Sequence, residues 1–246
     1  MIEVTSQDEV AILRMADGKA NAMSIEFCEA ITARFGELAQ RAIVITANGR
    51  IFSAGVDLLR LLDGGEPYIR KFLPALSTML ATVFAHPRPV VAAISGHAMA
   101  GGCVLACAAD RRLMAREAGR IGVTEILVGV PFPPAAMEIM RCALAPHYFE
   151  EAIFSGATYP PPQAHERGLV HEIVEPDTLL DRAVAAAKTL AALSPRAFAQ
   201  TKRQTRAPAL ERMDDPETDA AIAQIWTAPE TLAFIRDYVA RTLRKS

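Results

Sequence analysis

The 246-residue sequence predicts an α/β fold with a helical C-terminal appendage. Two apolar runs, 42–47 (AIVITA) and 90–94 (VVAAI), are typical of buried parallel strands. Such runs alternate with stretches of helical periodicity in the first two thirds of the chain, whereas only helical patterns follow Asp177. This alternation favours an α/β core, and the terminal helical stretch favours an appendage to it.

The N-terminal third contains the elements that open this core. Short apolar runs at 2–5 and 10–15 predict two strands separated by a polar turn. Ser24 is suited to cap a helix, because apolar residues recur after it at helical spacing: Phe27, Ile31, Phe35 and Leu38. The segment 50–58 (RIFSAGVDL) is expected to be a loop that leads to a helix after Pro67.

The rest of the chain continues the alternation and then becomes helical. The expected elements are a strand at 90–94, a helix at 101–109, short strands at 113–115 and 121–123, helices at 135–143 and 148–154, a short helix ending at Gly168 and a strand at 169–174. We therefore place a core domain at residues 1–192 and a C-terminal helical region at 193–246.

Composition and charge exclude several classes of protein. Hydrophobic residues make up 51% of the chain and charged residues 22%, which excludes wholesale disorder. The net charge of −2 gives no electrostatic basis for nucleic acid or an anionic membrane as a main partner. The uncharged stretch 90–109 has the length of a membrane span, but glycines interrupt it and charges follow at once. We expect a strand, a turn and a helix there instead.

Cysteine usage and the N-terminus point to an intracellular protein. The four cysteines form neither a metal-finger pattern nor a disulfide ladder, and we expect buried free thiols and no metal site. The N-terminal residues include an acid at position 3 and lack the apolar core of a secretory signal. A cytoplasmic location is the expectation.

Two strand-to-loop exits are unusually rich in small residues: 52–57 (FSAGVD) and 96–102 (GHAMAGG). Small residues let another group approach the backbone closely, and ligands of open α/β sheets bind beyond the carboxyl ends of strands. The second loop leads into a helix N-terminus, which favours negative charge. Side by side, the two loops could direct two N–H donors at one oxyanion. The alternative is that the small residues only allow close helix–sheet packing.

One carboxylate stands out as a candidate acid or base. The P-loop, dinucleotide-binding, nucleophile-elbow and zinc-protease motifs are all missing, which disfavours those enzyme classes. Glu125 lies within 121–127 (IGVTEIL), an apolar and β-prone segment. A carboxylate buried in such surroundings titrates high and suits acid–base catalysis. The alternative is an exposed glutamate on an edge strand.

Taken in order, these segments resemble the crotonase, or enoyl-CoA hydratase/isomerase, superfamily over most of the chain. Three segments match its CoA-contacting stretch, its FxAGxD loop and its GxAxGGG loop: 19–23 (KANAM), 52–57 (FSAGVD) and 96–103 (GHAMAGGC). Ala100 replaces the first of the three glycines in the last motif. Residues 168–170 (GLV) and Lys202 fall where the family has a GLV strand and a lysine near a CoA phosphate.

The resemblance implies a crotonase fold of repeated ββα units that assembles as a trimer or a dimer of trimers, with 193–246 as the trimerisation region. It implies an acyl-CoA ligand, carried by the substrate, and no other cofactor. The CoA would lie along Lys19, Ala20, Ala54 and Lys202. The expectation of an oligomer also draws on an apolar helix face that one domain of this size is not expected to cover fully: Leu179, Leu180, Val184, Ala187 and Leu190.

The resemblance also implies how the site works. The backbone N–H groups of Val56 and Gly101 would hold the thioester oxygen and stabilise an enolate. Hydratases of the family use two glutamates; Val104 occupies the first of these positions and Glu125 the second. A single acid–base residue with an apolar partner resembles the Δ3,Δ2-enoyl-CoA isomerases. Pro133 stands where dienoyl-CoA isomerases need an aspartate.

We therefore expect the protein to shift a 3-enoyl-CoA double bond to the 2-trans position, with Glu125 moving the proton and Met99, Val104 and Phe132 lining the acyl pocket. Enoyl-CoA hydration or another reaction of the family stays open, because a carboxylate such as Asp57 or Glu138 could reach the site. A non-catalytic acyl-CoA-binding relative is a further alternative. The basic cluster Lys202, Arg203 and Arg206 permits RNA binding, although a solvated helix face explains it better.

Overall fold

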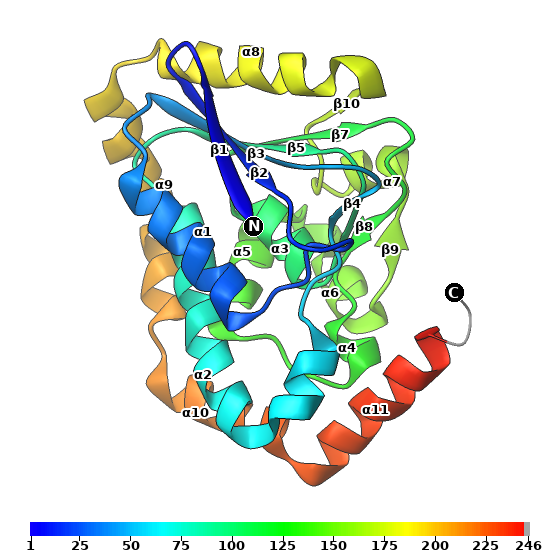
Figure 1. The fold of residues 1–246 in the computed structure, drawn as a ribbon. Coiled ribbons are helices and arrows are strands. Elements are labelled where there is room, and N and C mark those ends of the chain that lie inside the picture. The colour runs from blue at the N-terminus through cyan, green and yellow to red at the C-terminus, as the bar shows by residue number, and fades with distance from the viewer. Residues whose placement is uncertain (244–246) are drawn as a thin grey trace.

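The computed structural model of the chain describes residues 1–243 and contains two β-sheets (Figure 1). In the larger sheet β1 is antiparallel to β2, and all other neighbours are parallel. Its strands, in spatial order, are β1 (Ile2–Gln7), β2 (Val10–Met15), β3 (Ala42–Ala47), β5 (Val90–Ile94), β7 (Arg111–Ala115) and β10 (Glu172–Val174). The central strands β3 and β5 are buried along their whole length, as their uninterrupted apolar sequences require.

The smaller sheet is built from short strands that follow those of the larger one along the chain. They are β4 (Ile51–Ser53), β6 (His97–Met99), β8 (Ile121–Gly122) and β9 (Thr158–Tyr159). After each strand pair the chain enters a helix: α1 (Ile25–Glu37), α2 (Leu58–Ala85), α3 (Gly101–Ala108) and α4 (Glu125–Val128). This succession of ββα units confirms the predicted fold.

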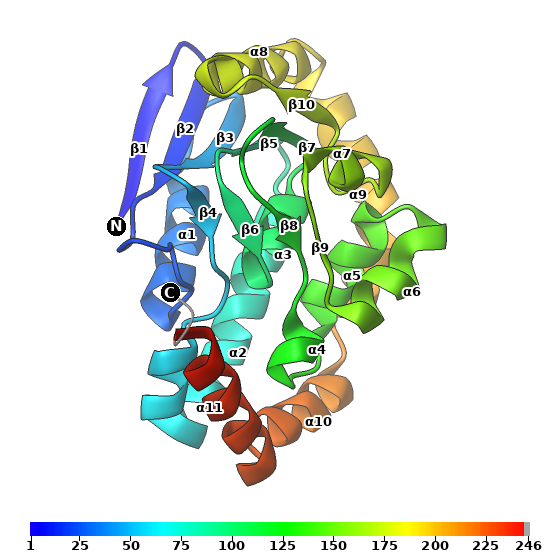
Figure 2. The same ribbon diagram turned by 90° about the vertical axis from the view of Figure 1, so that its right-hand side faces the viewer.

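Helices cover both faces of the larger sheet. Helix α8 (Leu179–Ala191) lies across one face, and α1 and α3 lie on the other (Figures 1 and 2). The remaining helices are α5 (Pro134–Ala143), α6 (Pro146–Ser155), α7 (Pro161–Glu166), the 3₁₀ turn η1 (Pro176–Thr178), α9 (Pro195–Met213), α10 (Pro216–Thr227) and α11 (Pro229–Leu243). Helices α10 and α11 pack back onto α2 of the same chain, so this part of the C-terminal region completes the domain's own core.

Helix α2 begins earlier than its proline suggests. Asp57 caps it, accepting a 3.0 Å hydrogen bond from the backbone N–H of Arg60. The helix is broken at Gly65, whose φ of 55° and ψ of −154° are not helical. Pro67 therefore occupies the first turn of the second half, where its missing N–H is tolerated. The expected helix start near Pro67 is thus the start of this second half.

Two short strands occupy segments that were expected to be loops. Residues 51–53 form β4, and residues 97–99 form β6, which pairs with β4 and β8. Each strand is only three residues long, and its pairing partner lies far away in the sequence. Periodicity over three residues cannot reveal a strand that long-range pairing creates.

Most of the apolar face of α8 is covered within this chain. Leu179, Val184 and Ala187 are buried, because α8 packs on β3, β5 and β7. Leu180 and Leu190 are only half-buried, so the domain does not cover this face fully, as expected.

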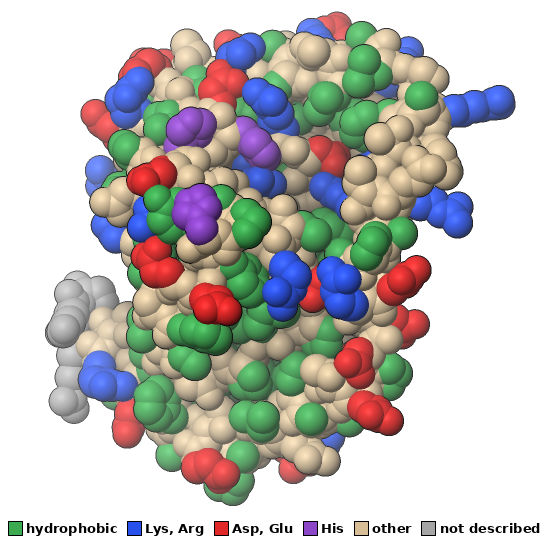
Figure 3. All heavy atoms as spheres, turned by 180° about the vertical axis from the view of Figure 1, so that it is seen from behind, with side chains coloured by type: hydrophobic (Ala, Val, Ile, Leu, Met, Phe, Trp, Pro, Cys, Tyr) green, Lys and Arg blue, Asp and Glu red, His purple; other side chains and the backbone are tan. Residues whose placement is uncertain are grey.

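Charged side chains of both signs are spread over the face shown in Figure 3, in keeping with the small net charge. In the space-filling view of Figure 3, basic and acidic side chains lie intermixed between apolar ones over that face. Within residues 1–243, no helix is both long and apolar enough to cross a membrane. The uncharged stretch 90–109 instead forms β5, β6 and α3: the predicted strand and helix are present, and β6 occupies the expected turn.

Candidate active site

Two segments far apart in sequence form the first wall of the site. Residues 20–23 run beside residues 54–57 like a short parallel strand. Three backbone hydrogen bonds join them: Ala54 N–H to Ala20 O at 2.9 Å, Met23 N–H to Gly55 O at 2.8 Å, and Asp57 N–H to Met23 O at 3.0 Å. The two segments that resemble CoA-contacting motifs are therefore held together by backbone pairing.

The second wall, the loop that enters α3, touches the first at Gly55. Gly55 has φ of 85°, and a Cβ atom added there would lie 2.9 Å from Met99 O and 3.1 Å from the backbone nitrogen of Gly101. Only glycine accepts both this backbone conformation and this contact distance. The small residues of the two loops thus let the backbones of the two loops come into contact.

Two backbone N–H groups at this junction are available to a ligand. Within residues 1–243, neither Val56 N–H nor Gly101 N–H donates a hydrogen bond to protein. Gly101 is the first residue of α3, where backbone donors have no intrahelical acceptor and the helix dipole favours an anion. A partly negative oxygen placed between the two loops would satisfy these donors.

The turn before Gly101 is strained. Ala100 has φ of 48° and ψ of −125°, a conformation that residues other than glycine rarely adopt. Its backbone N–H donates to Gly122 O at 2.9 Å, which ties the turn to β8. Such strain costs on the order of 1–3 kcal/mol and is typical of functional sites. The resemblance placed a glycine of the family at this position.

A cavity of about 470 Å³ opens beside the two loops and contains the carboxylate of Glu125. The loops contribute Ala20, Ala22, Ala54, Val56, Asp57, Met99 and Ala100; α2 contributes Leu58 and Leu59; and the α4 region contributes Thr124, Glu125, Val128 and Val130. This volume is within the range of small-molecule sites, and the lining is mostly apolar with few polar groups, as in such sites.

Glu125 is buried and in part unpaired. It is the first residue of α4 rather than part of a strand, and its side chain is only 8% exposed. Within the described residues its Oε2 atom has no hydrogen-bond partner. Burial raises the pKa of Glu125 to about 7, outweighing the hydrogen bonds that lower it. The alternative of an exposed edge-strand glutamate is therefore wrong, and the group can exchange a proton near neutral pH.

The C-terminal helices close the cavity, which sequence reasoning missed. The single tryptophan, Trp226 of α10, lines it and donates from Nε1 to Pro131 O at 2.9 Å. Helix α11 adds Tyr238, Val239 and Thr242. The only tryptophan of the chain was the one available signal, but nothing in its local pattern showed which segment it would meet.

Several predicted site residues lie elsewhere. Met99 lines the cavity, whereas Val104 is fully buried inside α3 and Phe132 borders a different hollow. That all three line the acyl pocket stays a prediction. Lys19 is exposed and is not part of the cavity lining, whereas Ala20 and Ala54 are.

Lys202 is not in the cavity either. Its Nζ donates to Asp110 Oδ2 at 2.8 Å and to Arg88 O at 3.4 Å, and the residue is 7% exposed. Asp110 also pairs with Arg206 at 2.8 Å and accepts from Val90 N–H at the start of β5, the end away from Glu125. An internal carboxylate holds this lysine, and its contact with a CoA phosphate stays a prediction.

This pairing also removes the basis for an RNA-binding cluster. Two of its three cations, Lys202 and Arg206, point inward to Asp110, and only Arg203 is exposed. The cluster is therefore neither a basic patch nor a solvated helix face.

The two other carboxylates considered for the site differ in position. Asp57 lines the cavity while it caps α2. Glu138 is held by Arg141 at 3.2 Å and by Arg212 at 2.6 Å, and these cations lower its pKa even though burial alone would raise it. Only Asp57 can therefore join Glu125 in the same cavity.

Comparison with known proteins agrees with this geometry. A family model described as enoyl-CoA hydratase/isomerase matches residues 5–229. The chain belongs to this family. It carries the crotonase fold, and the coarse function follows: it is an enoyl-CoA hydratase/isomerase-family enzyme that acts on acyl-CoA.

Similar solved structures differ in the reaction that they are named for. An enoyl-CoA isomerase of Mycobacterium tuberculosis is 33% identical, with a TM-score of 0.81 over 91% of this chain and 96% of that one. An enoyl-CoA hydratase of Mycobacterium marinum is 31% identical, with a TM-score of 0.80 over 91% and 97%. The human mitochondrial Δ3,Δ2-enoyl-CoA isomerase has a TM-score of 0.93 over 100% and 99% but is 21% identical, so it is similar in fold alone.

Proposed function

We propose that this enoyl-CoA hydratase/isomerase-family protein is a Δ3,Δ2-enoyl-CoA isomerase in which Glu125 is the acid–base residue. The observation that carries the proposal is the single unpaired, buried carboxylate in the cavity. A double-bond shift needs one group that takes a proton from C2 and returns it at C4. Hydration needs a second group that holds and deprotonates water.

The proposed reaction proceeds in two proton transfers. The Glu125 carboxylate removes a C2 proton, and the electron pair of that C–H bond delocalises over the C3–C4 double bond and the thioester carbonyl. The N–H groups of Val56 and Gly101 then stabilise the dienolate oxygen; one such donor contributes about 2.7–4 kcal/mol to the transition state. Protonated Glu125 returns the proton to C4, which leaves the double bond between C2 and C3 and regenerates the carboxylate.

The CoA part of the substrate would extend along Ala20 and Ala54, with Lys19 at the exposed end. Both alanines line the cavity and belong to the paired segments 20–23 and 54–57. CoA should therefore raise the melting temperature by binding to the folded protein. Absence of any shift at millimolar CoA would contradict this placement.

Enoyl-CoA hydration is the second candidate, and Asp57 is the observation that favours it. Asp57 lines the same cavity as Glu125, although its Oδ1 atom accepts the capping hydrogen bond of α2. In a hydratase it would hold the water molecule. An Asp57→Asn variant keeps a cap acceptor and should leave isomerisation within a few-fold of the unaltered rate, whereas a hydratase would lose activity.

A panel of 2-enoyl and 3-enoyl thioesters of several chain lengths tests the proposal directly. We expect 3-enoyl-CoA to be isomerised much faster than 2-enoyl-CoA is hydrated. Hydration that is the faster of the two, or no turnover of any enoyl-CoA, would contradict it. The second outcome would instead favour a non-catalytic acyl-CoA-binding protein.

We further propose that the chain forms a trimer or a dimer of trimers, in which the region 193–246 takes part. Exposed apolar side chains on α4 and α6 support a contact between copies: Ile126, Leu127 and Phe154. Light scattering should report three or six chains. A stable monomer of 26.5 kDa at micromolar concentration would refute the assembly.

A further inference from the structure

A second cavity of about 280 Å³ lies at the opposite end of the sheet from Glu125. It is formed where the turn before β5, the start of β3 and the connection from α8 to α9 meet. Pro89 forms part of its wall and immediately precedes β5, whereas the Glu125 cavity lies beyond the carboxyl end of that strand. The two cavities share no residue.

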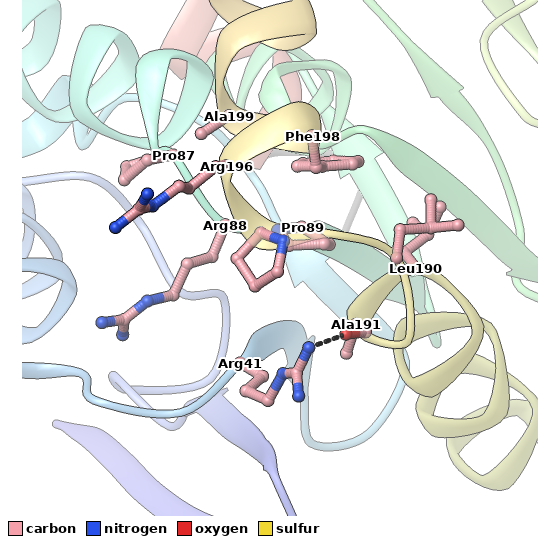
Figure 4. A pocket seen from close by; sticks show the side chains of 11 residues that line it. Arg41, Pro87, Arg88, Pro89, Leu190, Ala191, Arg196, Phe198 and Ala199 are labelled. Atoms are coloured by element: carbon pink, nitrogen blue, oxygen red, sulfur yellow. Dashed lines mark hydrogen bonds between the residues drawn. The ribbon is translucent and has the colours of Figure 1, made fainter.

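The two sides of this cavity differ in chemistry. In Figure 4 the side chains of Arg88 and Arg196 lie on the side away from Phe198 and Leu190, and Arg41 lies below them with its guanidinium toward the Ala191 carbonyl. The residues that line the cavity include no aspartate or glutamate. A hollow that combines an apolar wall with several cations is suited to a ligand that has both an apolar body and a negative charge.

The three arginines are poorly compensated by the protein. Arg41 has one carboxylate partner, Glu9, at 3.4 Å, and both side chains are a little under half exposed. Arg41 and Arg88 otherwise donate to backbone carbonyl groups, those of Ala191 and Leu38. In the described part of the chain no acceptor is paired with Arg196.

Arg196 also lies where a cation is unfavourable. It is in the first turn of α9, which contains no acidic residue, and the dipole of the helix opposes a positive charge there. An anion held beside Arg196 would relieve the repulsion from both the dipole and the neighbouring arginines. This electrostatic argument adds to the cavity and its lining, which are the main observations.

We propose that this cavity binds a small amphipathic carboxylate, with its carboxylate group on Arg196 and Arg88 and its hydrocarbon body against Phe198 and Pro89. The volume sets the size of the ligand. A cavity of about 150 Å³ holds benzene, so this one has room for roughly ten to twelve non-hydrogen atoms. A saturated carboxylate of about eight carbons has this size, and planar guanidinium groups match the geometry of a carboxylate.

Calorimetric titration of octanoate into the full-length protein tests the proposal, with CoA in excess so that the Glu125 cavity is occupied. We expect one octanoate per chain at micromolar to millimolar concentration. Acetate, which has the charge without the body, and octanol, which has the body without the charge, should each bind at least tenfold more weakly. Inorganic phosphate or acetate binding as tightly as octanoate would overturn the amphipathic ligand.

Two variants locate the binding. Arg196→Gln should weaken octanoate binding about tenfold or more, because a charge-assisted hydrogen bond is lost. The matched control is Arg203→Gln, an exposed arginine on the same helix that is absent from the cavity lining, and it should bind as the unaltered protein does. Equal affinity of the two variants, or no octanoate binding at millimolar concentration, would overturn the proposal.

A third variant tests the apolar part of the cavity without altering charge. Ala199→Leu adds volume at a lining position and should abolish octanoate binding. Circular dichroism shows whether this variant folds; if it does not, Arg196→Gln against Arg203→Gln decides. A folded Ala199→Leu variant that binds octanoate normally would place the ligand elsewhere and contradict the assignment.

Discussion

The two ends of the larger sheet differ in whether a carboxylate removed from solvent has a charged partner. Beyond the carboxyl ends of the strands, Glu125 is buried with one oxygen unpaired, and burial raises its pKa to about 7. At the amino ends of β5 and β7, Asp110 is held by Lys202, by Arg206 and by the backbone N–H of Val90. The first arrangement leaves a group free to exchange a proton. The second gives every charge a partner.

The unpaired carboxylate is suited to a reaction, whereas the paired cluster stabilises the fold. An unpaired buried carboxylate destabilises the fold, and such a group persists where a reaction uses it. A paired buried cluster cannot respond to a ligand without losing its own hydrogen bonds, and it joins α9 to the sheet. Both regions contain a charged residue that the family resemblance marked for function, yet only Glu125 lies in the cavity.

The largest effect should come from removing the unpaired carboxylate. Glu125→Gln keeps the shape of the side chain but cannot accept the C2 proton, so isomerisation of 3-enoyl-CoA should fall about 10²–10⁴-fold. Steady-state kinetics measures this, and CoA binding followed by thermal shift is the control that the cavity remains intact. A variant with full activity would remove Glu125 from the reaction.

Removing the centre of the paired cluster should affect folding instead. Asp110→Ala leaves Lys202 and Arg206 buried without a carboxylate, and we expect the free energy of unfolding to fall by about 3–5 kcal/mol. Activity per folded molecule should change little. The matched control is Glu37→Ala, which removes an exposed ion pair with Arg34 and should cost at most about 1 kcal/mol.

Denaturant unfolding of both variants measures the difference. If Asp110→Ala is no more destabilising than Glu37→Ala, the cluster is not a structural support. If it abolishes CoA binding while the fold is retained, Asp110 and Lys202 act at the site after all, and the comparison between the two ends of the sheet fails.

The pH dependence of stability should reveal the unpaired charge. Because the pKa of Glu125 is raised in the folded protein, its proton is bound more tightly there than in the unfolded chain. Its contribution to stability is therefore lost as pH rises through about 7. Glu125→Gln lacks this loss, so its stability relative to the unaltered protein should increase by about 2 kcal/mol between pH 5.5 and pH 8. Unfolding at the two pH values tests it, and a constant difference would contradict the raised pKa.

The same pKa should appear in the kinetics. The carboxylate form of Glu125 removes the C2 proton, so kcat/KM for 3-enoyl-CoA should rise about tenfold between pH 6 and pH 8, with a midpoint near 7. Rate measurements over this range, with buffer and substrate titration controlled, give the profile. A midpoint near 4.5 would mean that the cavity does not raise the pKa of its carboxylate.

The smallest effect concerns strain, which the site contains and the paired cluster does not. Ala100→Gly relieves the positive φ before Gly101 and should raise the free energy of unfolding by about 1 kcal/mol, the relieved strain being partly offset by the flexibility of glycine in the unfolded chain. Thermal unfolding measures this change. Destabilisation by the substitution would show that the Ala100 side chain, not its backbone, matters at this turn.

Much of this molecule could be read from local patterns. The uninterrupted apolar runs at 42–47 and 90–94 became the central strands, because a strand buried on both faces needs apolar residues on both. The cap at Ser24 is present, with its Oγ accepting from Phe27 N–H at 3.1 Å. These features depend on neighbours within a few positions, so the sequence alone was enough to predict them.

Sequence patterns were less informative where a residue's surroundings depend on distant segments. The family resemblance placed Lys202 near a CoA phosphate, whereas in the structure its ammonium group pairs with Asp110, 92 positions away. Val104 follows the glycine loop at the expected spacing, yet the turn of α3 points it into the core. The short strands β4 and β6 owe their existence to each other rather than to their own sequences.

The sequence by itself thus determined the α/β class, the central strands β3 and β5, the two loops rich in small residues and the candidate carboxylate Glu125. Only the tertiary structure decided that Trp226 and α11 close the cavity, that Asp57 shares it and Glu138 does not, and that Lys202 is internal. The physical reason is the range of the forces involved. Caps, turns and strand periodicity act between near neighbours, whereas burial and charge pairing depend on which distant segments the packed core brings together.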